Sequence, residues 1–123
     1  MGNEYLKLED LEVYQLAREL SRIGWATFEQ LNSEYRYIFG RQYITALDSI
    51  GANVAEGYGR YHYLDKAKFY YNARASLFEA KHWNELLFER KVLNSEQYES
   101  FLNKINLLNA KLNNLTKTTI NKK

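Results

Sequence analysis

The chain has 123 residues, a formal net charge of +2 and 46 % apolar residues, which suits one domain with a single buried core. It has no proline, the main helix breaker, and no cysteine, which excludes disulfides and thiolate metal sites. No apolar run approaches the roughly 18 residues of a membrane span, and no signal-peptide pattern opens the chain. Composition therefore favours an all-helical protein in the cytoplasm, without a membrane role.

The first predicted helix covers residues 8–31, where apolar residues recur every three or four positions. A second apolar row lies beside this core stripe and makes the apolar surface wider than one bundle seam needs. Its members are Leu11, Tyr14, Trp25 and Phe28. A monomer would expose this row, so we predict that it forms the interface of a homo-oligomer, most simply a closed ring.

The second predicted helix covers residues 35–56, after a turn and candidate N-cap at Asn32 and Ser33. Its core row is Tyr43, Leu47, Ile50 and Val54. Gly57 and Gly59 suit the left-handed residues that end a helix. Arg60 then stands just past the helix C-terminus, where the dipole favours a cation.

The third predicted helix covers residues 64–91, and the fourth begins at an N-cap at Asn94 and Ser95. Both have heptad-like apolar rows. These are Phe69, Ala73, Ser76, Ala80, Trp83 and Leu87 in the third, and Phe101, Ile105, Leu108, Leu112 and Leu115 in the fourth. Short loops make neighbours antiparallel, so we predict an all-α, up-down-up-down four-helix bundle over residues 1–115 and a disordered basic tail over 116–123.

Polar residues on the second and third helices form a candidate structural motif. A polar cluster between two helices fixes their register, and its acids need partners because an unpaired buried charge is costly. Arg60 and Arg74 are the nearest such partners in sequence. With the two glycines, the motif comprises Ser49, Asn53, Glu56, Gly57, Gly59, Ser76 and Glu79.

The sequence lacks a catalytic constellation. Glu79 and His82 have the i, i+3 spacing of a di-iron ligand pair, but such a site needs a second pair, and the chain has only two histidines. There is no phosphate-binding glycine loop and no serine elbow. We predict a protein that is not an enzyme and that has no metal, cofactor or small-molecule substrate.

Basic and aromatic residues interleave in the middle of the chain, where guanidinium groups reach phosphates and rings stack on bases. The basic members are Arg36, Arg41, Arg60, Lys66, Lys68 and Arg74, and the tyrosines are Tyr37, Tyr43, Tyr58, Tyr61 and Tyr63. Tyrosines also pack at helix ends, and both interpretations stay open. The hypothesis is a surface that binds RNA or DNA. The alternative is a protein–protein interaction scaffold with no nucleic-acid role.

Three blocks resemble one known family. Residues 49–60 read S-I-x-x-N-V-A-E-G-x-G-R, residues 69–79 read F-x-x-x-A-x-x-S-x-x-E, with Ala75 inside them where many relatives have glycine, and residues 10–17 form the third block. The likeness covers roughly residues 8–115. The chain is similar to the four helix bundle proteins encoded as 23S rRNA intervening sequences, also called the S23 ribosomal protein family. The resemblance implies homopentamers arranged as a barrel. It also implies a fold similar to the accessory variability determinant of diversity-generating retroelements, which is thought to bind nucleic acid and reverse transcriptase.

Overall fold

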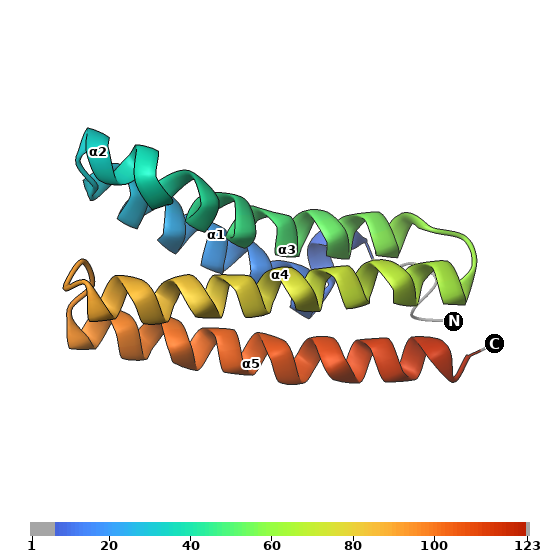
Figure 1. Ribbon diagram of the computed structural model, residues 1–123. Coiled ribbons are helices and arrows are strands. Elements are labelled where there is room, and N and C mark those ends of the chain that lie inside the picture. The colour runs from blue at the N-terminus through green and yellow to red at the C-terminus, as the bar shows by residue number, and fades with distance from the viewer. Residues whose placement is uncertain (1–6, 123) are drawn as a thin grey trace.

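The computed structural model describes residues 7–122, and within them every regular element is helical and no strand occurs. The all-helical prediction is therefore confirmed. Residues 1–6 of the predicted domain and residue 123 of the predicted tail lie outside the described residues. Four long helical segments make up the fold (Figure 1). The elements are η2 (Leu8–Asp10), α1 (Glu12–Gln30), α2 (Ser33–Tyr35), the π-helical turn η3 (Arg36–Gly40), α3 (Arg41–Gly59), α4 (Tyr63–Glu89) and α5 (Ser95–Ile120).

The four long helices are arranged so that α1 packs on α3 and α5, and α4 packs on the same two helices. Helices α1 and α4 are therefore diagonal to each other. Figure 1 shows α3, α4 and α5 running in alternating directions, with the α3–α4 turn and the C-terminal end of α5 at the same end of the bundle. None of the described helices combines the length and apolar composition that a bilayer crossing requires.

Two helix starts follow from local sequence. The Asn32 side chain accepts a hydrogen bond of 2.8 Å from the backbone N–H of Tyr35 and caps α2. The Asn94 side chain likewise accepts from the N–H of Gln97, whose own side chain accepts from the Asn94 N–H, and this reciprocal pair caps α5. Both predicted N-caps are confirmed, because a cap depends on only three or four neighbouring residues.

The core contains most of the predicted rows, but the row of α4 is displaced by one position at every second step. Ala73, Ala80 and Leu87 are buried as predicted, whereas Phe69, Ser76 and Trp83 are only half-buried. The residue that follows each of these three is buried instead. These residues are Tyr70, Leu77 and Asn84. This displacement arises because α4 also has apolar residues on its outer face, so that spacing alone did not identify the buried side.

The predicted glycine stop is wrong. Helix α3 continues through Gly57 and Gly59 to a C-cap at Arg60, and no described glycine has a positive φ. Gly57 is needed for close packing instead, because a Cβ there would lie 2.7 Å from Cε1 of Tyr70 and 3.0 Å from the carbonyl oxygen of Lys66. The close approach of α3 to α4 therefore explains the glycine.

The left-handed residue of the described chain is Lys91, with a φ of 62°, at the end of α4. The N–H of Lys91 donates to the carbonyl of Phe88, and the N–H of Val92 donates to the carbonyl of Leu87. These two bonds form a Schellman motif, which satisfies the last carbonyls of the helix. A lysine occupies the position where glycine is usual, so the residue type does not predict this helix end.

The predicted disordered tail is also wrong for residues 116–120, which continue α5. Thr116 and Thr119 are 7 % and 6 % exposed, and the hydroxyl of Thr116 donates to the carbonyl of Leu112 at 2.8 Å. Threonine is counted as polar in a sequence pattern, but a hydroxyl that bonds to a carbonyl of its own helix allows the side chain to be buried.

Candidate nucleic-acid interface

The six predicted basic residues do not form one surface. Arg36 belongs to η3 and Arg41 begins α3. Arg60 follows α3, and Lys66 and Lys68 lie in the first two turns of α4. These two groups are at opposite ends of the second long helical segment (Figure 1). The sixth residue, Arg74, is farther along α4. The closeness of these six residues in sequence predicts one patch. Each residue of a helix advances about 1.5 Å along the axis, however, so residues at opposite ends of a long helix lie far apart.

Arg36 is committed to holding the end of α1. Its Nε donates to the carbonyl of Phe28 at 3.2 Å, and a terminal nitrogen donates to the carbonyl of Glu29 at 2.7 Å. The guanidinium also lies 5.3 Å from the centre of the Phe28 ring. Both carbonyls belong to the last turn of α1, where intrahelical donors run out, and that of Phe28 also accepts from the Leu31 N–H, so Arg36 has a structural role.

Arg60 and Lys66 also have partners within the chain. Arg60 forms an ion pair of 2.9 Å with Glu56 and lies 4.6 Å from the centre of the Phe69 ring. The Lys66 ammonium donates to the carbonyl of Tyr58 at 2.7 Å, which ties α4 to the last turn of α3. Burial, followed by the nearby charge of Lys122, lowers the pKa of Lys66.

The effect of the Lys122 charge on the pKa of Lys66 indicates positive charges that lie close together and that the sequence pattern did not predict. Lys122, just after α5, lies close enough to Lys66 to repel its charge. Lys117, one turn earlier, lines an open groove between α4 and α5 together with Tyr71 and Arg74. The sequence predicts a disordered tail for both lysines, but the continuation of α5 brings them to the end of the bundle. We define the basic end as Lys66, Lys68, Lys117 and Lys122.

Exposed tyrosines adjoin the basic end. Tyr61 in the α3–α4 turn is 88 % exposed, and Tyr63 at the start of α4 is 41 % exposed. Tyr37 is exposed too, but it belongs to the π turn at the other end. Tyr43 is a core residue with 0 % exposure, so its assignment to a stacking surface is wrong.

The polar residues of the structural motif make local contacts. The Asn53 amide donates to the carbonyl of Ser49 at 2.9 Å, within α3, and Glu56 pairs with Arg60 as described. Glu79 is exposed and accepts a bond of 3.3 Å from the indole N–H of Trp83, within α4. The described bonds thus stay within single helices, and the expected cluster between helices is not formed by them, because Glu56 and Glu79 face solvent.

The Glu79 and His82 pair gains no third ligand. Among residues 7–122 no group of three or more histidine, cysteine or acidic side chains converges on a point. The His82 ring instead meets the Trp83 ring edge-on, with centroids 5.4 Å apart.

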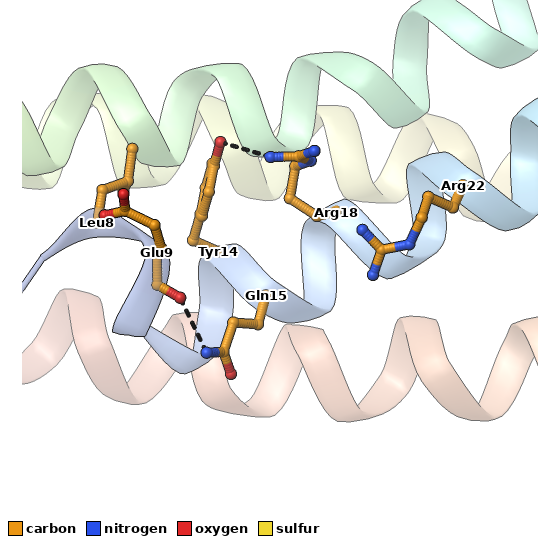
Figure 2. Close-up of a pocket in the computed structure, with 6 residues that line it drawn as sticks. All are labelled: Leu8, Glu9, Tyr14, Gln15, Arg18 and Arg22. Atoms are coloured by element: carbon orange, nitrogen blue, oxygen red, sulfur yellow. Dashed lines mark hydrogen bonds between the residues drawn. The ribbon is translucent and has the colours of Figure 1, made fainter.

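The second apolar row of α1 is partly used by the chain itself. Leu11, Tyr14 and Phe28 are half-buried and pack on the chain's own core, whereas Trp25 is 51 % exposed and stacks on Phe28 at 5.3 Å. Figure 2 shows a hollow beside this row. There the Tyr14 hydroxyl accepts a bond of 3.1 Å from Arg18, and the Gln15 amide donates to the carbonyl of Glu9 at 2.9 Å.

A second apolar row, on the outer face of α4, was not predicted. Leu64, Tyr71 and Phe78 recur every seven residues and are 65 %, 55 % and 41 % exposed. Ala75 is exposed between the last two. The seven-residue spacing was visible in the sequence, but the overlapping core row of the same helix concealed it.

The described residues thus define a small helical bundle in which none of the described charged side chains is buried. A family model described as 23S rRNA-intervening sequence protein matches residues 9–114. The chain belongs to this family. A similar solved structure is a protein of unknown function from the S23 ribosomal protein family of Bacteroides thetaiotaomicron. The two are 26 % identical, the match covers 85 % of this chain and 98 % of that one, and the TM-score is 0.78. No curated protein matches the chain.

Proposed function

We propose that this protein is a non-enzymatic, cytoplasmic homo-oligomer, most simply a pentamer of antiparallel up-down-up-down bundles, that binds the phosphate backbone of structured RNA. The observation that carries the nucleic-acid part is the basic end. Lys66 of α4 and Lys122 after α5 repel each other there, and Lys68 and Lys117 lie in nearby turns of the same two helices. Tyr61 and Tyr63 are exposed at the start of α4. Lysines supply phosphate contacts and rings supply stacking, which together are typical of sequence-tolerant binding.

Repulsion between the lysines supports this proposal. The pKa of Lys66 is lowered in part by Lys122, so the unliganded protein holds positive charges that repel each other. A phosphate placed between such groups relieves that repulsion and releases counterions from the nucleic acid. One chain offers few such charges. A symmetric oligomer multiplies them, and the family's name associates related proteins with rRNA genes.

The test is a mobility-shift titration with structured RNA at several salt concentrations. Replacing both Lys117 and Lys122 by Gln should weaken binding and reduce the slope of log affinity against log salt by roughly 1 to 2, because each lost phosphate contact removes nearly one unit. Both side chains are exposed, so the fold should survive. Arg41→Gln, at the opposite end of α3, is the matched control and should leave the slope unchanged.

A protein-interaction scaffold is the second candidate. The apolar outer row of α4 favours it, because large exposed apolar residues in a row are typical of protein contacts. If the wild-type protein binds no RNA or DNA at low salt, the nucleic-acid proposal is wrong and the scaffold remains.

A further inference from the structure

We propose that self-association joins two different faces of the chain, with Trp25 of one copy seated between Tyr71 and Phe78 on α4 of the next. This pairing rests on the proposed homo-oligomer and specifies its contact. The two faces belong to helices that are diagonal in the bundle, since α1 and α4 each pack on α3 and α5. One chain cannot bring them together, so the contact requires a second copy.

The two faces have the same periodicity and nearly the same length. The α1 row contains Leu11, Tyr14, Trp25 and Phe28, with Arg18 and Ser21 at the positions between them. The α4 row contains Leu64, Tyr71, Ala75 and Phe78, with His82 at its end and with Lys68, which also belongs to the basic end, after Leu64. Both alternate steps of three and four, and each extends on the order of 26 Å at about 1.5 Å per residue. Such rows are the pattern with which helices from different chains pack side by side.

The shapes of the two faces are complementary, and neither matches itself. On α1 the other apolar members are half-buried, so Trp25 is the large side chain that projects, with 51 % exposure. On α4 the small side chain of Ala75 lies between two exposed rings, Tyr71 and Phe78. Positions 71, 74, 75 and 78 have the i, i+3, i+4, i+7 spacing of the hole that receives a knob from a facing helix.

The chemistry around this hole also suits an indole ring. The Arg74 guanidinium lies 4.8 Å from the centre of the Phe78 ring, so a cation already borders the hole. A tryptophan face attracts such a cation and packs well against aromatic rings. Two copies of Trp25 facing each other would instead meet knob to knob. A contact between unlike faces repeats from copy to copy, and it closes a ring or continues as a filament.

The first experiment measures mass by sedimentation velocity. Trp25→Glu removes the knob and Ala75→Lys fills the hole, so each should convert the oligomer to a monomer of 14.6 kDa with its helical circular dichroism retained. Ala26→Glu and Asn72→Lys place the same charges on exposed neighbours outside the two rows and should leave the oligomer intact. A monomeric wild type overturns the proposed oligomer itself. An oligomer that survives Ala75→Lys overturns only this pairing.

The second experiment uses the absence of native cysteine. Arg22→Cys at the margin of the α1 row and Ala75→Cys on α4 are combined and treated with a short bismaleimide. The double variant should give a ladder of covalent oligomers. Neither single variant should form a covalent dimer alone, whereas an equimolar mixture of the two should. A dimer from either single variant shows that like faces meet, and the pairing is then wrong.

Discussion

Gly57 and Gly59 are two positions apart in α3, yet a side chain at each would meet different surroundings. A Cβ on Gly57 would lie 3.0 Å from the Lys66 carbonyl oxygen, a backbone atom that cannot move aside alone. A Cβ on Gly59 would meet nothing within 4 Å. The two glycines are therefore similar in sequence and different in function. One permits helix contact, and the other stands free at a helix end.

Gly57→Ala should therefore destabilise the protein by about 1–3 kcal/mol, the usual cost of overpacking, which exceeds alanine's better helix propensity. Gly59→Ala should be neutral or stabilising by up to about 1 kcal/mol, because the position is helical and open. Chemical denaturation of both variants measures the difference. Equal destabilisation by the two would restore the left-handed interpretation of the glycines.

Tyr70, the residue that Gly57 contacts, should make stability depend on alkaline pH. Burial, followed by the neighbouring Tyr58, raises the pKa of Tyr70 to about 12. In the unfolded chain a tyrosine loses its proton near pH 10. The folded state thus keeps a proton that the unfolded state loses, so stability is full below about pH 10 and falls as pH rises through about 12.

Urea denaturation across this range measures the loss. Tyr70→Phe has no proton to hold, so its unfolding free energy should fall less steeply between about pH 9 and 12. Tyr37 is 78 % exposed, so Tyr37→Phe serves as the control. Parallel pH profiles for wild type and Tyr70→Phe would contradict this account.

At the scale of elements, α5 shows that a helix can continue through a segment of mostly polar residues. Its last turns bury Thr116 and Thr119 and bring Lys117 and Lys122 to the basic end. The same element thus contributes to the core and to the proposed interface. A chain cut where the sequence pattern ended would lose both contributions.

A chain that ends after Leu115 should therefore be less stable than the full chain by about 1–3 kcal/mol, from lost burial and lost helix. A chain that ends after Asn121 keeps the buried threonines and should unfold at nearly the full-length midpoint. Thermal unfolding followed by circular dichroism compares the three lengths. Identical midpoints for all three would show that the last turns of α5 do not support the core.

The elements differ in how well the sequence predicts them, because some signals are local and others are not. The N-caps at Asn32 and Asn94 depend on adjacent residues and were predictable. The end of α4 was not, because Lys91 adopts a conformation that its own residue type disfavours. The core row of α4 was half right, since apolar residues on two faces of one helix weaken the periodicity that identifies the buried side.

The candidate site was less predictable than the fold. Arg36 and Lys66 belong to the predicted basic set, yet both donate to backbone carbonyls at helix ends. Those carbonyls come near only because the chain reverses direction, which spacing in sequence does not reveal. Lys122 was missing from the predicted basic set for the opposite reason. It is far away in sequence from the basic set and joins it only through the length of α5.

At the scale of the whole molecule, the contact between α1 and α5 has a consequence for the order of folding. Contacts between α3 and α4 and between α4 and α5 join neighbours in sequence and close short loops. The contact of α1 with α5, with ion pairs from Glu12 to Lys111 and from Glu19 to Lys104, joins the two ends of the chain. Long-range contacts of this kind form late, because the loop that they close is long. During synthesis on the ribosome α1 can pack on α3 as soon as α3 has emerged, but the part of its surface that faces α5 stays open to chaperones until α5 is complete.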